Sequence, residues 1–469
     1  MAEIEGLNSR QGGLNGSYGR LTSTRKANTK LRGEKTGTWA PAPTSCSAAV
    51  GLPHPAKTWN SRLAKTSKQS VSFPIAHMIT RLRVQNFKSL RKLDLELGPI
   101  NVLVGPNMAG KSNILDVFRF LHQTFFPEAG TEGVSYALAQ RGGVNEVLWK
   151  GGDEKLITVA LEGTDITEPG TKYKYELQLI AGVGDFVTTQ NESLKLFRAG
   201  VECDLITREQ GFVRFKNADG KDFGGGIGSS SVSALQYAVP GWDGFKFQQW
   251  ARLWRFYHLV PPAMKQPSLM SLGQVLQPGG DNVSAWLMWL QAHSPESFRR
   301  VNEVIRDLFS EVVQINVIPT PDGKVHLATR EKGLKRATNV WQTSDGFIAL
   351  TALLSLIYVP PELSGTVFCI EEPENHLHPK LLETLVGLLR QVRQEAVGAG
   401  LSLTQIMLTT QSPYLLDHFS LDEIVWVEKK NGETLAFRPA DKKHLKKLIE
   451  DEELGLGDLM FTGALAEEK

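Results

Sequence analysis

A glycine-rich segment, G-P-N-M-A-G-K-S at residues 105–112, constrains the fold of this chain more than any other feature. It follows a short apolar run, Asn101–Val104. The residues after it are apolar at helical spacing: Ile114, Leu115, Val117, Phe118 and Leu121. A strand, a glycine loop and a helix in this order form the context in which a P-loop folds. The segment therefore predicts an α/β sheet with a phosphate-binding loop at the end of one strand.

The residue types of this loop suit a bound triphosphate and Mg²⁺. Gly105 and Gly110 permit a tight turn that a Cβ would obstruct. We expect Lys111 to reach the β- and γ-phosphates and Ser112 to place its hydroxyl on Mg²⁺. Main-chain N–H groups at the helix N-terminus would surround the phosphates. The predicted nucleotide-binding residues are Gly105, Pro106, Asn107, Met108, Ala109, Gly110, Lys111, Ser112 and Asn113.

A second motif, F-C-I-E-E-P-E-N at Phe368–Asn375, lies about 255 residues further along the chain. The apolar run Val367–Ile370 suits a buried strand, and ligands of open α/β sheets bind at the carboxyl ends of such strands. We expect Glu371 to hold Mg²⁺, through water, and Glu372 to orient and deprotonate an attacking water. Two glutamates alone are weak evidence of a site, but together with the P-loop they predict hydrolysis of ATP.

Residues 1–77 differ in composition from the rest of the chain. They carry 11 Lys and Arg against 3 Asp and Glu, whereas the remainder carries 41 against 47 (52 − 11 and 50 − 3). Their Gly, Ser, Thr, Asn and Pro content predicts a disordered basic tail. Two alternatives stay open: a start-site artefact ahead of Met78, or an arm that grips a phosphate backbone. The acidic remainder does not indicate nucleic-acid binding, and the local patches Arg299-Arg300 and Lys332–Arg336 are also compatible with solvated surface charge.

Residues 78–469 show patterns typical of strands and helices, and residues 150–260 are mostly strand-like. We expect a nucleotide-binding part at 78–149, a β-rich lobe with a helical insertion at 150–335, and a third part at 336–469. Predicted strands are Ile79–Val84, Leu93–Leu97, Ile157–Leu161, Tyr173–Ile180, Leu194–Phe197, Thr366–Glu371, Gln405–Thr409 and Ile424–Val427, with a hairpin of Gln314–Pro319 and Lys324–Thr329. Predicted helices are 283–310, 347–359 and Lys380–Arg393. The C-terminal alternation predicts a parallel sheet.

Three cysteines, Cys46, Cys203 and Cys369, are too few for a disulfide framework and suggest a reducing cytosol. The longest apolar run, Ile348–Val359, is too short to span a bilayer, so no membrane association is expected. His376 and His378 form a His-x-His pair without a cluster of further metal ligands.

Several segments together resemble the ABC-type ATPases of the SMC/RecF/OLD group, in particular its compact prokaryotic branch of predicted AAA ATPases. They are I-T-R-L-R-V-Q-N-F-K-S-L from residue 79, G-P-N-M-A-G-K-S-N from residue 105, T-S-D-G-F from residue 343, I-E-E-P-E-N-H-L-H-P from residue 370 and T-T-Q-S-P from residue 409. The resemblance runs from Met78 to the C-terminus. It implies a P-loop NTPase fold of ABC-head type, with a mixed or parallel core sheet, helices and an antiparallel β-rich lobe.

The resemblance also implies a composite site in a homodimer. In this group a signature segment of one subunit caps the nucleotide held by the other, and Ser344, Asp345 and Gly346 match that segment. Gln411 stands where the group usually has a histidine that contacts the γ-phosphate. Because glutamine donates a hydrogen bond but carries no charge, a nucleotide-gated interaction protein with little turnover is the alternative to an ATPase.

Absent features narrow the resemblance. The residues between the two nucleotide motifs lack sustained heptads, so SMC-type arms are not expected. Only 58 residues follow Gln411 (469 − 411), so we expect no nuclease domain there. The transporter signature L-S-G-G-Q is missing. The resemblance implies a cytoplasmic head that dimerises on ATP and drives a DNA-linked process, either DNA repair or anti-phage defence. DNA and a separately encoded nuclease or toxin are the candidate partners.

Overall fold

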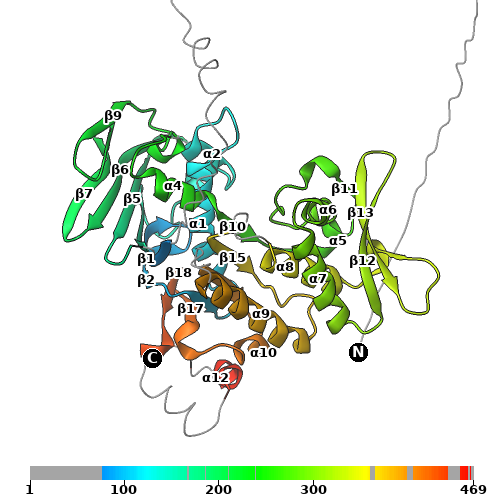
Figure 1. Ribbon diagram of the computed structural model, residues 1–469. Coiled ribbons are helices and arrows are strands. Elements are labelled where there is room, and N and C mark those ends of the chain that lie inside the picture. The colour runs from blue at the N-terminus through cyan, green and yellow to red at the C-terminus, as the bar shows by residue number, and fades with distance from the viewer. Residues whose placement is uncertain are drawn as a thin grey trace, which may run out of the picture. The chain divides into compact units, whose positions relative to one another are not determined.

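The structure is a computed structural model of the 469-residue chain (Figure 1). It describes residues 77–165, 168–184, 186–209, 211–237, 239–359, 365–398, 405–441, 455–462 and 465. The tail predicted for residues 1–77 therefore lies outside the described residues, except for His77. That residue begins the first strand, one position before the predicted start at Met78.

Six strands of the described residues form the core sheet, in the order β10-β15-β16-β3-β17-β18. Their bounds are β10 (Trp254–Tyr257), β15 (Val367–Glu371), β16 (Gln405–Thr410), β3 (Ile100–Val104), β17 (Ile424–Lys430) and β18 (Glu433–Phe437). All neighbours are parallel except the β17–β18 pair. The register sets Glu371 beside Thr409 and Thr410 beside Val104. The carboxyl ends of β15, β16 and β3 therefore meet at one edge of the sheet.

Helix α1 (Lys111–Phe125) follows β3 and packs between two sheets (Figure 1). Phe118 lies edge-on to Trp254 of the core sheet, with 6.1 Å between ring centroids. Phe125 lies edge-on to Tyr175 of the second sheet, at 5.1 Å. The apolar stripe that predicted this helix is thus buried from both sides, which fixes the position of the helix N-terminus.

The second sheet is antiparallel, with the described strand order β2-β1-β4-β5-β6-β7-β8-β9. Its strands are β1 (His77–Phe87), β2 (Leu90–Glu96), β4 (Leu156–Asp165), β5 (Lys172–Ala181), β6 (Val187–Arg198), β7 (Val201–Glu209), β8 (Phe212–Lys216) and β9 (Asp222–Ile227). Helices α2 (Gly133–Ala139), α3 (Val144–Val147) and α4 (Phe245–Arg252) accompany it. Alternating buried and exposed residues in β5 and β6 explain why this part of the sequence reads as strands.

A smaller sheet holds the segment that leads to Ser344. It contains β11 (Ser268–Leu269), β12 (Val312–Pro319), β13 (Lys324–Glu331) and β14 (Thr338–Asn339). Its helices are α5 (Pro261–Met264), α6 (Val283–His293) and α7 (Pro295–Leu308). The helical pattern predicted for 283–310 is confirmed, but as two helices: the first ends before Ser294, and α7 begins with Pro295 in its first turn. Helix α8 (Asp345–Ile357) packs against α5, α7 and α9 (Pro379–Gly398).

The structure confirms the predicted α/β class, with a largely parallel core sheet and an antiparallel β-rich lobe. The parallel strands predicted at the C-terminal end are β15, β16 and β17, and the predicted hairpin is β12–β13. Strand β10 was not predicted, because its W-R-F-Y sequence shows neither a long apolar run nor clean alternation. Among the described helices, none is long and apolar enough to cross a membrane.

Candidate nucleotide-binding and hydrolysis site

Two glycines of the P-loop occupy positions that other residues could not share. Gly110 caps α1 with a φ of 104°, and a Cβ there would lie 2.1 Å from Thr434 Oγ1. At Gly105 a Cβ would lie 1.8 Å from the carbonyl oxygen of Val427. Both neighbours belong to the β17–β18 hairpin. The close approach of this hairpin therefore requires glycine at both ends of the loop.

The loop presents unpaired main-chain donors to its surroundings. Five main-chain N–H groups between residues 107 and 112 donate no hydrogen bond to any described residue. They are those of Asn107, Met108, Gly110, Lys111 and Ser112. The last two belong to the first turn of α1, where an intrahelical acceptor does not exist. Met108 is 87% exposed, so the middle of the loop is accessible to solvent. Such a set of donors at a helix N-terminus fits an anion, and a triphosphate in particular.

The side chain of Lys111 folds back onto the main chain of the loop. Its Nζ donates to the carbonyl oxygens of Gly105 (2.7 Å) and Pro106 (2.9 Å), and its side chain is buried. Burial lowers the pKa of Lys111, while the charges of Glu372 and Glu374 oppose that shift. The lysine therefore lies between the P-loop and the turn at residues 372–377 that follows β15, here called the acidic turn.

A hydroxyl pair under the loop holds its shape. Thr434 Oγ1 donates to the carbonyl oxygen of Ala109 at 2.7 Å and lies 2.7 Å from Ser89 Oγ. Asn113, predicted to bind nucleotide, directs its amide to Ser89 Oγ at 2.6 Å. The predicted role of Asn113 in nucleotide binding thus has no direct support from its side-chain contacts, which instead link α1 to the supporting pair.

The two predicted carboxylates leave the end of β15 in different environments. Glu371 accepts a hydrogen bond from Arg119 of α1 at 3.0 Å. Glu372 has a positive φ of 45°, and its N–H donates to the carbonyl oxygen of Thr409 at 3.0 Å. A left-handed conformation in a residue other than glycine is strained, and such strain is common at functional sites.

Both carboxylate oxygens of Glu372 have amide donors. Gln411 Nε2 donates to Oε1, and Asn375 Nδ2 donates to Oε2 at 2.9 Å. The structure thus brings together two residues, Glu372 and Gln411, that lie 39 positions apart and that the motifs predicted independently. Asn375 is an additional contact that the sequence analysis did not single out.

A third carboxylate, Glu374, lies beside this pair. Its Oε1 accepts from Thr410 Oγ1 at 2.6 Å and from the main-chain N–H of Gln411 at 3.0 Å. Its Oε2 is buried and has no hydrogen-bond partner in the part of the chain that the structure describes. Burial raises the pKa of Glu374, and the charge of Glu372 raises it further.

The signature segment lies at the start of α8. Ser344 caps the helix by accepting from the N–H of Phe347 at 3.1 Å. Asp345 pairs with Lys265 at 2.6 Å and lies 3.7 Å from His376 Nδ1. A Cβ on Gly346 would lie 2.4 Å from the carbonyl oxygen of His376. Across the described ranges, no hydrogen bond or ion pair joins this segment to the P-loop of the same chain.

The His-x-His pair does not form part of a metal cluster. Among the described residues, no group of three or more His, Cys, Asp and Glu side chains is placed to hold a metal ion. His376 instead connects the acidic turn to Asp345 of the signature segment.

Two family models match the chain. A model described as "AAA ATPase domain" matches residues 78–196, which include the P-loop. A model described as "AAA domain, putative AbiEii toxin, Type IV TA system" matches residues 269–417, which include the signature segment, the acidic pair and Gln411. Both models describe AAA-type domains, which agrees with the resemblance to AAA ATPases that the motifs predicted.

Curated relatives match over short stretches. A stretch of 38 residues is 55% identical to an OLD nuclease of Thermus scotoductus, which covers 8% of this chain and 7% of that protein. A stretch of 55 residues is 40% identical to the DNA replication and repair protein RecF of Roseiflexus castenholzii, which covers 12% of this chain and 14% of that protein. The chain thus matches only a small part of the length of these relatives.

Solved SMC heads are similar in part. A structure titled as the SmcHead bound to the C-winged helix domain of ScpA has a TM-score of 0.48 at 15% identity, covering 77% of this chain and 99% of that chain. The SMC head domain from Thermotoga maritima has a TM-score of 0.40 at 16% identity, covering 77% and 98%. The fold class rests on the strand order of the chain itself.

Proposed function

We propose that this chain is a Mg²⁺-dependent ATPase head that dimerises when it binds ATP. The observation that carries the proposal is the hydrogen-bonded pair of Glu372 and Gln411, at the same sheet edge as a P-loop with unpaired N–H donors. A base, a hydrogen-bond donor and an anion cradle at one edge are the parts that phosphoryl transfer to water needs.

Each residue has a separate task in this proposal. The free N–H groups of the loop and Lys111 bind the phosphates and hold them in one orientation. Glu372 accepts the proton of the attacking water, and Gln411 fixes the carboxylate that accepts it. Ser112, whose side chain is exposed, and Glu371 would hold Mg²⁺. The ion would neutralise charge that develops on the phosphate oxygens.

The position of the signature segment supports the proposed dimerisation. Ser344 begins a 13-residue helix, and the exposed N-terminus of such a helix favours a phosphate. Because no contact joins it to the P-loop in the described residues of one chain, we propose that it completes the site of a second copy. Two copies that each supply both halves form a two-fold dimer.

We also propose that the ATPase drives a DNA-linked process, repair or anti-phage defence, in the cytoplasm. The names of two relatives, a DNA replication and repair protein and an OLD nuclease, support a DNA link. The family description that mentions a putative toxin supports a separately encoded nuclease or toxin as effector.

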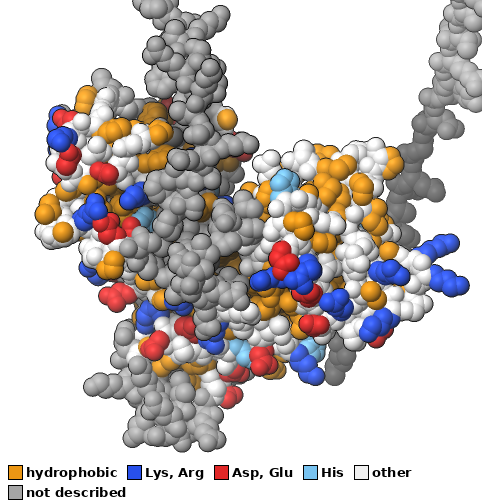
Figure 2. Space-filling view, viewed as in Figure 1, with side chains coloured by type: hydrophobic (Ala, Val, Ile, Leu, Met, Phe, Trp, Pro, Cys, Tyr) orange, Lys and Arg blue, Asp and Glu red, His pale blue; other side chains and the backbone are white. Residues whose placement is uncertain are grey.

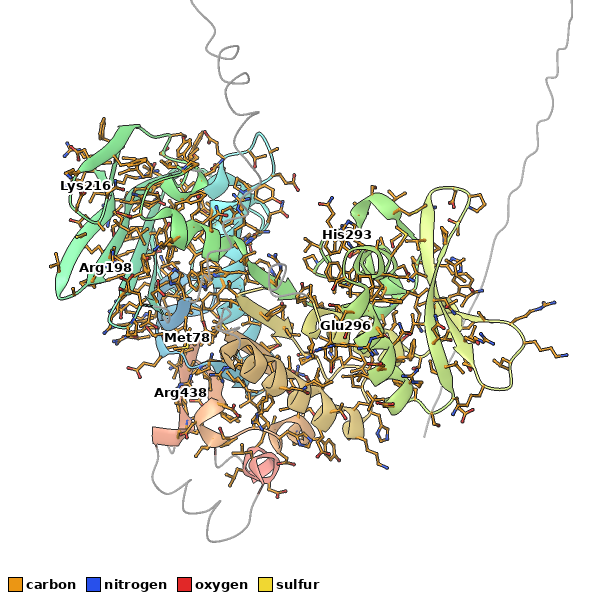
Figure 3. The ribbon with its side chains drawn as sticks, in the orientation of Figure 1. Met78, Arg198, Lys216, His293, Glu296 and Arg438 are labelled. Atoms are coloured by element: carbon orange, nitrogen blue, oxygen red, sulfur yellow. The ribbon has the colours of Figure 1, made fainter. Side chains whose placement is uncertain are left out.

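The two basic patches that were considered as DNA contacts in the sequence differ in their ion pairs. Arg299 and Arg300 on α7 are neutralised by Glu296, and Arg299 also pairs with Glu303. Figure 3 labels Glu296 on this helix. In the loop between β13 and β14, Lys332, Lys335 and Arg336 are exposed and form no ion pair with any described residue.

Figure 2 shows Lys and Arg side chains gathered over the part of the molecule that carries β12 and β13. This loop precedes β14 and, a few residues further along the chain, the signature segment. We propose the β13–β14 loop as the DNA-contacting surface, because unpaired cations can release counterions from a phosphate backbone.

A nucleotide-gated protein with little turnover is the second candidate, and Gln411 favours it. Glutamine supplies a hydrogen bond but no positive charge to the γ-phosphate. Rates of ATP hydrolysis by wild type and by Glu372→Gln separate the two functions. We expect the wild type to turn over at least about a hundredfold faster than the variant. Equal, slow rates would contradict the ATPase and leave the gated protein.

A further inference from the structure

We propose that Glu374 is a positioning residue that holds Gln411 within hydrogen-bonding reach of Glu372. The inference rests on the proposed ATPase function and extends it to a residue that takes no part in the chemistry itself. Glu374 acts through the main chain of Gln411 rather than through the substrate.

The contacts of Glu374 link two turns that leave neighbouring strands. Glu374 belongs to the turn after β15, and both partners of its Oε1 belong to the end of β16 and the turn that follows. Thr410 Oγ1 donates at 2.6 Å and the N–H of Gln411 at 3.0 Å. Thr410 Oγ1 in turn accepts from the N–H of Ser412 at 3.0 Å. One carboxylate oxygen therefore fixes the backbone on both sides of the Gln411 side chain.

The turn that carries Glu374 is itself well defined. The N–H of Asn375 donates to the carbonyl oxygen of Glu372 at 3.0 Å, and the N–H of Leu377 donates to that of Glu374 at 2.9 Å. Pro373 limits the backbone between the two glutamates. Glu374 is thus anchored to the same turn as Glu372, so its contact with Gln411 sets the distance between Gln411 and Glu372.

A carboxylate at position 374 lowers the stability of the fold. Glu374 Oε2 is buried without a described partner, and a second negative charge lies nearby on Glu372. A buried acceptor without a partner destabilises a fold. The same side chain accepts two hydrogen bonds through Oε1, from Thr410 Oγ1 and from the N–H of Gln411. The cost is consistent with a need to hold Gln411 rigidly.

Turnover and ATP affinity of Glu374→Ala and Glu374→Gln test the proposal. We expect Glu374→Ala to lower kcat about tenfold or more while the Kd for ATP changes less than about threefold. Glu374→Gln keeps an acceptor oxygen and should retain most of the rate. Glu423→Ala is the matched control: Glu423 Oε2 accepts from Arg390 and from the N–H of Ser420, both at 2.8 Å, away from the site. It should leave kcat unchanged.

A double variant tests whether Glu374 acts through Gln411. On a Gln411→Ala background, Glu374→Ala should lower kcat by less than about twofold further, because its target is already gone. The proposal would be overturned if the losses of kcat in the two single variants multiply in the double variant, or if Glu374→Ala is as fast as wild type.

A crystal structure of Glu374→Ala gives an answer that does not depend on turnover. We expect the Gln411 amide to leave Glu372, with the core sheet unchanged. An unmoved Gln411 would overturn the positioning role even if the chain hydrolyses no ATP. Conversely, displacement of Gln411 together with a wild type that shows no turnover would uphold the role and contradict the proposed ATPase function.

Discussion

The P-loop with Glu372 and Gln411, here called the phosphate side, differs from the signature segment Ser344–Gly346, here called the signature side, in how many of its contacts one chain supplies. On the phosphate side, Lys111 bonds within its own loop, and Glu372 bonds to Gln411 across two strand ends. On the signature side, Ser344 and Asp345 have contacts to their own helix, to Lys265 and to His376, but none to the phosphate loop within the described residues. The proposed reactive groups of the phosphate side thus contact one another within one chain, whereas the signature side has no contact with them in the described residues.

In the proposed dimer, this difference indicates which segment a second copy would supply. The reactive groups need only the fold of one chain, whereas the signature helix offers its N-terminus outward. His376 belongs to the turn that begins with Glu372 and contacts Asp345, so each phosphate side is connected to its own signature side. A change at one site of a dimer would in this way reach the other.

Removing Lys111 should impair the phosphate side alone, and we expect the loss of ATP affinity to be the largest effect among these variants. Lys111→Ala loses a charged donor inside the loop, and we expect ATP affinity to fall about a hundredfold or more, as titration calorimetry would measure. The exposed Lys92 on β2 provides the control, since Lys92→Ala should bind as wild type does. Unchanged affinity in Lys111→Ala would show that the loop does not bind the triphosphate.

A negative charge at Ser344 should break the signature side alone. Ser344→Asp keeps the helix cap, because aspartate caps as well as serine, and sets a carboxylate against the γ-phosphate of a partner. We expect turnover to fall at least about tenfold while a single chain binds ATP as before. Ser344→Asn, a neutral cap of the same shape, should lose less. Full turnover in Ser344→Asp would place the signature segment outside the site.

Charge reversal in the β13–β14 loop should have a smaller effect, measured on DNA binding. Lys332→Glu, Lys335→Glu and Arg336→Glu together should weaken binding of a duplex DNA. They should also reduce the slope of log affinity against log salt by about 3, as fluorescence anisotropy would measure. The pair Arg299→Glu and Arg300→Glu is the control, because its arginines are already neutralised by Glu296 and Glu303. Equal losses in the two variants would refute a DNA contact at this loop.

Local patterns in the sequence predicted the strands and the helix around the P-loop well. The P-loop, the strand that ends in Glu371 and the parallel order of β15, β16 and β17 all follow from short apolar runs and glycine spacing. The break between α6 and α7 was missed because both helices present apolar residues in one register, and only Pro295 marks the restart. A proline inside a helical pattern is the signal that could have located it.

Contacts between distant residues could not be predicted in the same way. Thr434 supports a loop that lies 325 positions earlier, and nothing in the sequence around Thr434 indicates that contact. Glu374 was visible as part of the acidic motif, but its link to Thr410 depends on the register of two parallel strands. Strand β10 joins the core sheet only because β15 offers it an edge. Such features come from tertiary packing rather than local sequence.

Mixing two inactive variants measures most directly whether the site is shared between copies. Lys111→Ala chains lack a working phosphate side, and Ser344→Asp chains lack a working signature side. Half of randomly assorted dimers are mixed, and each would hold one complete site, so an equal mixture should recover about one quarter of the wild-type ATPase rate. A mixture that stays as inactive as its components, although the two chains associate, would contradict a site completed by a second copy.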